Sequence, residues 1–425
     1  MSEAAQATVM AGKAPATAGR LWNKNFLLLW QGQLVSSLGD VVYEIALGFW
    51  VLAATGSTAI MGTLMAATTL PRILVSPAAG VWVDRSDRRW VLVWSDVVRG
   101  LAIVLVGVAA LLGRAQVWMV FAGGVVMGLG SAFFGPAVGS ALPDIVPRES
   151  IVRANSAFGL IGTTTGIVGN SAGGLIYQFL GAPLLFLFNG LSYLYAGLAS
   201  LFIGVPRVVH ASPEFHFWRD FRGGLAFVWR IAGLRDLILL AAGMNFFGNM
   251  GFILMLPMFQ RTAGLGPARY GIAMAVVTAG FLVGLLALSA VAVPPRRRFA
   301  VFNAGLVITC LCWALFPLVS FYPMLAVGLL GAACNSVVNT LISSVMQLAT
   351  PAEMRGKVFS LMGTVTGGLM PLGMALGGVL AEFLPVRPII AVCMIVPAFI
   401  AVPLFFSSPF RRFINFDPET QTELQ

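Results

Sequence analysis

The chain has 425 residues, of which 58% are hydrophobic and only 10% are charged, and its formal net charge at pH 7 is +10. Soluble proteins carry about 25% charged residues. A chain of this length with so few charges is therefore not expected to fold as one water-soluble globule. Its 48 Gly and 23 Pro are typical of transmembrane helices that pack closely or break locally.

Apolar runs recur along the chain, each about 20 residues long, the length that crosses roughly 30 Å of hydrocarbon. Because these runs are too long and too continuously apolar for barrel strands, they predict helices. Residues 1–20 lack the apolar core of a signal peptide, and we expect them and Asp417–Gln425 to be disordered. The twelve predicted spans are 25–53, 58–82, 90–112, 116–141, 153–179, 183–204, 236–260, 268–292, 300–319, 323–347, 357–383 and 387–406.

The distribution of basic residues predicts the orientation of the chain. Most of the 26 Lys and Arg fall in the two termini and in every second loop between the spans. This is the positive-inside pattern of membrane proteins. It predicts that both termini are cytoplasmic, and it explains the basic charge without a nucleic-acid partner.

The loop between the second and third spans combines one glycine with four charged residues, Gly80, Asp84, Arg85, Arg88 and Arg89. Charges beside hydrocarbon are costly, so this loop is expected to have a role at the membrane face. The pattern Gly, three residues, Asp-Arg, two residues, Arg-Arg resembles the corresponding loop of major facilitator superfamily transporters. The resemblance implies a latch of the cytoplasmic gate. We expect Asp84 to pair across the molecule with the segment of Arg355 and Lys357 when this side is shut.

The sequence offers little for catalysis or for metal binding. The four cysteines lie inside predicted spans without a CxxC pair, and the two histidines lie in the central loop. Neither pattern is typical of a metal site or a disulfide framework. No nucleophile stands beside a base, so we expect no enzymatic activity, no metal and no organic cofactor.

An internal repeat relates residues 146–180 to residues 350–384 in ungapped register. The matched glycines are Gly169, Gly173 and Gly174 in the first copy, and Gly373, Gly377 and Gly378 in the second. Small residues four apart let helices approach closely, and we interpret these glycines, with Asn170 beside them, as packing positions. A competing register aligns 162–166 with 363–367 and points to an insertion or deletion inside the repeat.

The repeat predicts the architecture of the whole chain. Two six-helix halves in parallel orientation are related by an axis along the membrane normal, and substrate binds between them near the midplane. The fold class is thus an all-α membrane protein with twelve transmembrane helices. The predicted parts are a tail at 1–20, halves at 21–205 and 236–410, a cytoplasmic linker at 206–235, and a tail at 411–425.

The linker contains the pattern of an amphipathic helix. Residues 212–214, Ser-Pro-Glu, are typical of a helix start. The apolar residues that follow at helical spacing are Phe217, Phe221, Leu225 and Val228. We expect an interfacial helix that tethers the two halves, and a binding site for a partner protein is the alternative.

Further segments resemble the macrolide-efflux branch of the superfamily's drug–proton antiporters. They include Leu21-Trp-Asn-Lys-Asn-Phe26, residues 31–40, Ala141-Leu-Pro-Asp144, Arg153-Ala-Asn155, Arg355-Gly-Lys-Val-Phe-Ser360 and Pro371-Leu-Gly373. The likeness covers about residues 21–410. This branch is similar in sequence to exporters of antibiotics and of siderophores, so the resemblance implies export by alternating access with a proton as the coupling ion.

The chain also departs from the family pattern. Asp87 stands where many members carry Gly, Asn170 stands where the antiporter motif of the fifth helix has Pro, and the span 116–141 lacks the Arg of many drug–proton antiporters. The last two departures put proton antiport in doubt. The second-half counterpart of the gate loop, residues 294–298, lacks the Asp, so we expect a one-sided latch.

In this superfamily the first, fourth, seventh and tenth helices line the central cavity. Three of these spans carry a polar pair at spacing i, i+4, and therefore on one helical face: Asp40 and Glu44, Asn245 and Asn249, Asn335 and Asn339. Polar groups at this depth usually face a bundle interior or a water-filled cavity. The alternative for the asparagines is hydrogen bonding between helices. For the carboxylates we favour proton coupling, since burial and mutual repulsion both stabilise a protonated form.

Two arginines lie inside spans, Arg72 in the second and Arg99 in the third. An unpaired Arg at the centre of a membrane costs about 2.5–3.5 kcal/mol even on the lenient insertion scale. We therefore expect each to have a carboxylate within reach, Asp96 for Arg99, and Asp40 or Glu44 for Arg72. The alternative is that both arginines only hold the first half together.

The sequence thus predicts a secondary active exporter of an amphiphilic small molecule, drug-like or siderophore-like. We expect a monomer in a bacterial-type inner membrane whose partners are its substrate and the lipid bilayer. An importer, a transporter of a lipid-like substrate, or a membrane receptor or scaffold that transports nothing are the alternatives.

Overall fold

The computed structural model describes residues 21–204, 217–291 and 293–417, and every regular element within them is helical. The first half holds α2 (Lys24–Thr55), α3 (Thr58–Asp84), α4 (Arg88–Leu111), α5 (Val117–Ile145), the short turn η1 (Arg148–Ser150) and α6 (Ile151–Leu201). The segment α7 (Phe217–Arg230) follows. The second half holds α8 (Ala232–Phe252), α9 (Met255–Arg261), α10 (Pro267–Ala290), α11 (Pro295–Leu315), α12 (Phe321–Ala349), α13 (Ala352–Phe383), α14 (Val386–Phe405) and α15 (Ser408–Ile414).

Helix α6 is a hairpin of two spans rather than one long rod. Its backbone leaves the helical region at Gly181, where φ is 72° and ψ is 170°, a conformation that glycine adopts without steric cost. From Gly32 to Gly39 of α2, the neighbour on the second arm of α6 shifts backwards from Ala196 to Asn189. The second arm therefore runs antiparallel to α2, whereas the first arm runs parallel to it.

The predicted all-α membrane fold is confirmed. Eleven helical segments among the described residues are long and apolar enough to cross a membrane. The remaining predicted span, 153–179, corresponds to the first arm of α6. With α6 counted as two arms and α8–α9 as one interrupted span, the helices correspond to the twelve spans expected from the sequence.

Local sequence explains where several helices begin. Asn23, Ser57 and Asp87 precede α2, α3 and α4, and each side chain accepts a backbone N–H of the first turn, at 3.0, 3.2 and 3.1 Å. Such caps satisfy N–H groups that have no partner inside the helix. Asp87 therefore acts as the N-cap of α4.

Two segments differ from plain spans. The seventh predicted span is interrupted, because α8 ends at Phe252 and α9 begins at Met255. The boundary drawn at residue 411 falls inside α15, whose Phe413 and Ile414 are buried. These residues pack on the second half through α8, α11, α12 and α14.

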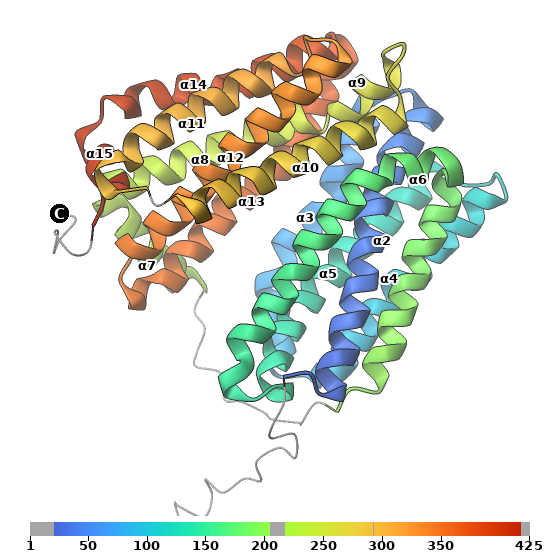
Figure 1. Ribbon diagram of the computed structural model, residues 1–425. Helices are drawn as coiled ribbons and strands as arrows, with labels where there is room; N and C mark the ends of the chain where they lie inside the picture. The colour runs from blue at the N-terminus through green and yellow to red at the C-terminus, as the bar shows by residue number, and fades with distance from the viewer. Residues whose placement is uncertain (1–20, 205–216, 292, 418–425) are drawn as a thin grey trace, which may run out of the picture.

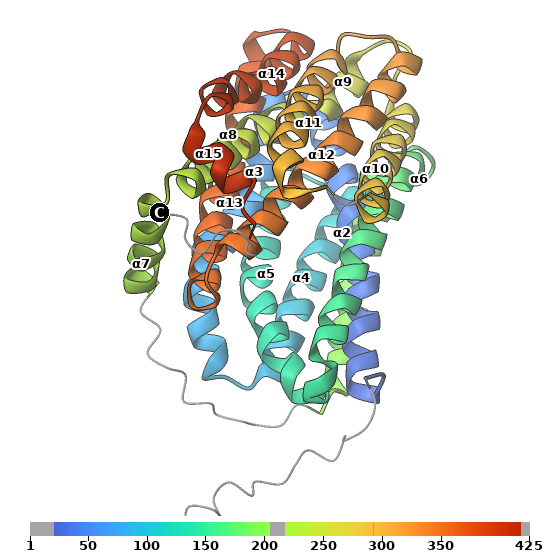
Figure 2. The same cartoon turned by 60° about the vertical axis from the view of Figure 1, so that its left-hand side comes forward.

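Helix α7 lies within the predicted linker and packs on α8 and α13. Val228 is buried, and Leu225 packs against the same apolar cluster. Figures 1 and 2 both show α7 beside the first turns of α13. The proposed helix start at residues 212–214 and the side chains of Phe217 and Phe221 lie outside the described residues. The described part of α7 is thus attached to the second half.

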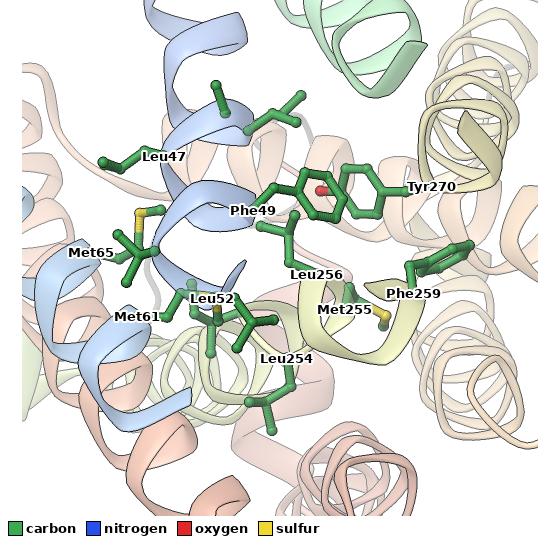
Figure 3. Packing of buried hydrophobic residues seen from close by; sticks show 14 of the residues in the cluster. Leu47, Phe49, Leu52, Met61, Met65, Leu254, Met255, Leu256, Phe259 and Tyr270 are labelled. Atoms are coloured by element: carbon green, nitrogen blue, oxygen red, sulfur yellow. The ribbon is translucent and has the colours of Figure 1, made fainter. Parts of the chain in front are cut away.

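The two bundles meet at one end and diverge at the other, as Figure 1 shows. We call the end that holds Gly56 and Glu382 the joined face, and the end that holds residues 85–87 the open face. Hydrophobic residues of both halves form a plug at the joined face (Figure 3). In it, the ring of Phe49 from α2 packs edge-on against that of Tyr270 from α10, with centroids 5.6 Å apart.

The halves touch most closely where glycines remove side chains from crossing helices. Gly378 of α13 lies against Gly62 of α3, and Gly174 of α6 lies against Gly271 of α10. At each crossing, an added Cβ would collide with backbone atoms of the partner helix. Because Gly174 and Gly378 are matched positions of the repeat, the two crossings are equivalent and give the joined face an approximate twofold symmetry.

The other repeat glycines pack within their own halves. Gly169 and Gly173 lie against side chains of α2, whereas Gly373 and Gly377 lie against the backbone of α8. The side chain of Asn170 lies outside the described residues. Close packing of small residues is the main source of helix association in lipid, where the hydrophobic effect between helices is absent.

We predict that Gly378→Ala lowers the melting temperature of the purified protein by several degrees, because the new methyl group has no room beside α3. Gly363→Ala, on the same helix, is the matched control, since no atom lies within 4 Å of its added Cβ. It should be neutral or stabilising, as alanine favours helices over glycine by roughly 0.5–1 kcal/mol. Thermal unfolding in detergent measures both variants, and equal melting temperatures would contradict the prediction.

Candidate functional site

A cavity of about 590 Å³ lies between the two halves. Its first-half wall is the first arm of α6, around Gly162 and Thr163, and its other walls come from α8 and from α10 to α14 of the second half. All four predicted asparagines, Asn245, Asn249, Asn335 and Asn339, line it. The remaining lining is mainly apolar and includes Trp313 and Phe281, and no charged residue of the described chain is among the lining residues.

The asparagine side chains make their hydrogen bonds along their own helices. Asn249 Nδ2 donates to the carbonyl of Asn245 at 2.7 Å, and Asn339 Nδ2 donates to the side-chain oxygen of Asn335 at 2.8 Å. Asn245 Nδ2 donates to the carbonyl of Ala241 at 2.9 Å. These contacts differ from the interhelical hydrogen bonds considered as the alternative. They hold the amides in place on the cavity wall.

A second cavity, of about 180 Å³, lies in the first half and contains the predicted charged residues. Asp40, Glu44 and Arg72 all line it, together with Tyr193 and with Met370 of α13. Neither acid is hydrogen-bonded or ion-paired to Arg72, although the arginine is close enough to interact electrostatically with both. The expected contact of Arg72 with an acid is therefore a through-space attraction and not an ion pair.

The two carboxylates differ in their surroundings. Both oxygens of Asp40 are 2.7 Å from the hydroxyl of Tyr193, which donates to them. The side chain of Glu44 is exposed, in contrast to the expectation of two buried acids on one face. The side chain of Arg72 is exposed as well. One turn of α2 thus presents one acid that Tyr193 holds and one exposed acid that lines the small cavity.

Tyr193 connects Asp40 to a buried ion pair. Arg99 donates to the Tyr193 hydroxyl at 3.1 Å and to Asp96 at 2.5 Å, and both members of the Arg99–Asp96 pair are buried. The guanidinium also lies over the rings of Tyr193 and Phe134, at 4.2 and 4.7 Å from their centroids. Asp96, Arg99, Tyr193 and Asp40 therefore form one continuous polar chain across α4, α6 and α2.

Sequence reasoning missed Tyr193. A signal was present, because Asn189, Ser192 and Tyr193 recur at helical spacing within the otherwise apolar span 183–204. Their positions place them on the face of α6 that meets α2, where Asn189 lies against Gly39. The alternative role expected for Arg99 was only to hold the first half together. Its contacts to residues of α4, α5 and α6 agree with that role.

The residues of the gate loop are bound within the first half. Asp84 accepts a hydrogen bond from the hydroxyl of Ser140 at 3.1 Å. Arg88 is buried and forms an ion pair with Asp144 of α5, while Arg89 donates to the carbonyl of Leu201.

Other parts of the predicted gate carry fewer contacts. Arg85 is exposed, and a Cβ added at Gly80 would meet no neighbouring atom within 4 Å. Arg355 and Lys357 lie in the first turns of α13, but their side chains are outside the described residues. The gate loop lies at the open face, where the halves diverge (Figure 1). The cross-half contact of Asp84 that we predict for a shut open face thus stays a prediction.

We predict that Asp96→Asn strongly lowers thermal stability, because it leaves the charge of Arg99 buried without its counter-ion. Removing one partner of a buried ion pair typically costs about 3–5 kcal/mol. The double variant Asp96→Asn/Arg99→Gln removes both charges and should unfold at a higher temperature than Asp96→Asn. Melting temperatures of the parent, the two single variants and the double variant measure the coupling between the two residues. A loss of stability in the double variant equal to the sum of the two single losses would contradict the prediction.

Comparisons with known proteins agree with this geometry. The family model described as Major Facilitator Superfamily matches residues 29–369 and 296–421. Macrolide efflux protein A of Streptococcus pyogenes is 23% identical over 368 residues, covering 85% of this chain and 90% of that protein. Multidrug efflux pump Tap of Mycolicibacterium fortuitum is 28% identical over 379 residues, covering 84% of this chain and 89% of that protein.

Solved structures of the same fold are also similar to this chain. A bacterial homologue of the iron transporter ferroportin, in an inward-facing state, has a TM-score of 0.69 and 17% identity, and the match covers 91% of this chain and 100% of that one. The nucleoside transporter NupG has a TM-score of 0.66 and 13% identity, with 92% and 99% of the two chains covered. The family match, the helical fold and the cavity between two halves together identify the chain as an integral membrane transport protein that belongs to the Major Facilitator Superfamily.

Proposed function

We propose that the protein is a secondary active exporter of amphiphilic small molecules that works by alternating access and is driven by proton exchange. The observation that carries this proposal is the cavity between the halves, which combines apolar walls with four asparagine amides. Such walls suit a substrate with a large apolar body and several hydrogen-bonding groups. Drug-like and siderophore-like molecules share this chemistry.

The direction and location of transport are part of the proposal. The similar proteins named for macrolide and multidrug efflux favour export, and the positive-inside pattern favours an inner membrane with both termini in the cytoplasm. The open face would then be the cytoplasmic entrance for substrate. The alternative of import is kept because solved neighbours of this fold include a nucleoside transporter.

We propose that Asp40 and Glu44 carry the proton coupling. Glu44 is exposed, and in this proposal a cationic group of the substrate takes the place of its proton. Asp40 accepts a hydrogen bond from Tyr193, whose hydroxyl accepts one from Arg99. A change in the charge of Asp40 therefore acts on the buried Arg99–Asp96 pair. Protonation from outside would neutralise the acids, and release inside would restore their charge, which is the simplest basis for exchange.

The test is transport in proteoliposomes with and without an imposed pH gradient, using a labelled macrolide and the cationic amphiphile ethidium as probes. We expect the gradient to accelerate transport of at least one probe in the direction that corresponds to export. Glu44→Gln and Asp40→Asn should each lower gradient-driven transport by about fivefold or more, in the range of typical coupling free energies.

The double variant Asp40→Asn/Glu44→Gln should be little worse than the more damaging single variant, because both acids belong to one coupling unit. Glu149→Gln, an exposed acid near the open face, is the control and should transport normally. Normal acceleration by the gradient in the double variant would eliminate this site. Transport unaffected by any pH gradient in the wild type would eliminate proton exchange itself.

We also predict that Asp84→Asn favours the conformation seen here and reduces transport while expression stays normal. The variant weakens the cross-half contact of Asp84 that we predict for the state with the open face shut. A hydrogen bond to a charged group contributes about 1.5–3 kcal/mol, enough to shift a two-state population several-fold. The measurement is the labelling rate of single cysteines introduced at the open face, again with Glu149→Gln as control. Unchanged labelling combined with full transport would show that Asp84 contributes only to membrane topology.

A further inference from the structure

The turn between α2 and α3 of the first half is contacted by two oppositely charged side chains of the second half. Arg261, at the end of α9, donates to the backbone carbonyl of Gly56. Glu382, in the last turn of α13, accepts hydrogen bonds from the backbone N–H groups of Thr58 and Ala59 at 3.0 and 3.3 Å. The same carboxylate oxygen accepts from the hydroxyls of Thr58 and Ser57, at 2.9 and 3.2 Å.

Each charge meets the helix end that it complements. Gly56 is the C-cap of α2, with φ of 68°, and carbonyls at a helix C-terminus attract cations. Thr58 is the first residue of α3, and N–H groups at a helix N-terminus attract anions. Since the cap Ser57 already serves the N–H of Ile60, Glu382 supplies the partners that Thr58 and Ala59 would otherwise lack.

The repeat shows that this arrangement is specific to one crossing. Glu382 follows Gly378 by four residues, and the matched position after Gly174 is Gln178. At that equivalent crossing the partner helix α10 begins at Pro267, which has no backbone N–H to donate. Close packing is thus common to both crossings, whereas the charged contact exists at only one.

We propose that Glu382 and Arg261 form an electrostatic clamp that holds the joined face shut and that must release in every transport cycle. The clamp joins the halves through two side chains and the backbone of a single turn, so it can break without repacking a core. Glu382 is exposed, and its contacts are therefore open to screening by salt. The proposal rests on alternating access, but on neither the substrate nor the coupling ion proposed above.

The experiment measures the distance between the halves at the joined face. Spin labels at Leu112→Cys and Tyr322→Cys, both strongly exposed, in a background in which the four native cysteines are replaced, report its opening by pulsed electron resonance. In the parent protein we expect one short distance. Glu382→Gln and Arg261→Gln should each raise the population of a longer distance at least threefold.

Two controls separate the clamp from general damage. Gln178→Ala changes the matched position of the other crossing and should leave the distances of the parent unchanged. Raising salt to about 1 M, where the screening length falls to about 3 Å, should enlarge the longer population of the parent protein more than that of Glu382→Gln, which keeps only the Arg261 contact.

The salt series tests the clamp even if a charge variant cannot be purified. Parent-like distances in both charge variants, or no response of the parent to salt, would overturn the clamp. Because this readout needs no transport, the clamp can hold even if the proposed export or proton coupling fails. The clamp can also fail while the proposed export holds. Normal transport together with an unchanged distance distribution in the charge variants would reject the clamp alone.

Discussion

The architecture depends on the close approach of two helix pairs, α3 with α13 and α6 with α10. In lipid, apolar side chains gain little from leaving one hydrocarbon environment for another, so association relies on contact between backbones. Glycines at residues 62, 174, 271 and 378 make that contact possible. Because both crossings lie near one end of the molecule, the bundles are joined there and free to diverge elsewhere, and a cavity follows between them.

The two halves differ in their polar chemistry. The first half holds the charges, in a polar chain from Asp96 through Arg99 and Tyr193 to Asp40. The second half holds neutral amides on an apolar wall. A buried charge needs partners in any conformation, and here the partners of Arg99 all belong to the first half. Its ion pair can therefore stay intact while the halves move relative to each other.

Much of the fold was predictable because it depends on local pattern and on length. The spans, the repeat and the role of small residues all follow from apolar runs and from glycines four residues apart. The site was predictable only in part, since the i, i+4 pairs identify faces but not neighbours. Tyr193 acquires its role from contacts to α2 and α4, and the exposure of Glu44 depends on how the surrounding helices pack. In the sequence, nothing distinguishes Glu382 from other polar residues at the ends of spans, and its role follows only from its contacts with α3.

The connection at Gly181 has a consequence for how the protein is made. A single residue outside the helical region reverses the chain between the two arms of α6. With so little chain between them, the arms are expected to enter the bilayer together, as a helical hairpin, during synthesis at the ribosome. The same economy leaves hardly any peptide outside the lipid at this point, so a protease added on that side of the membrane would find little here to cleave.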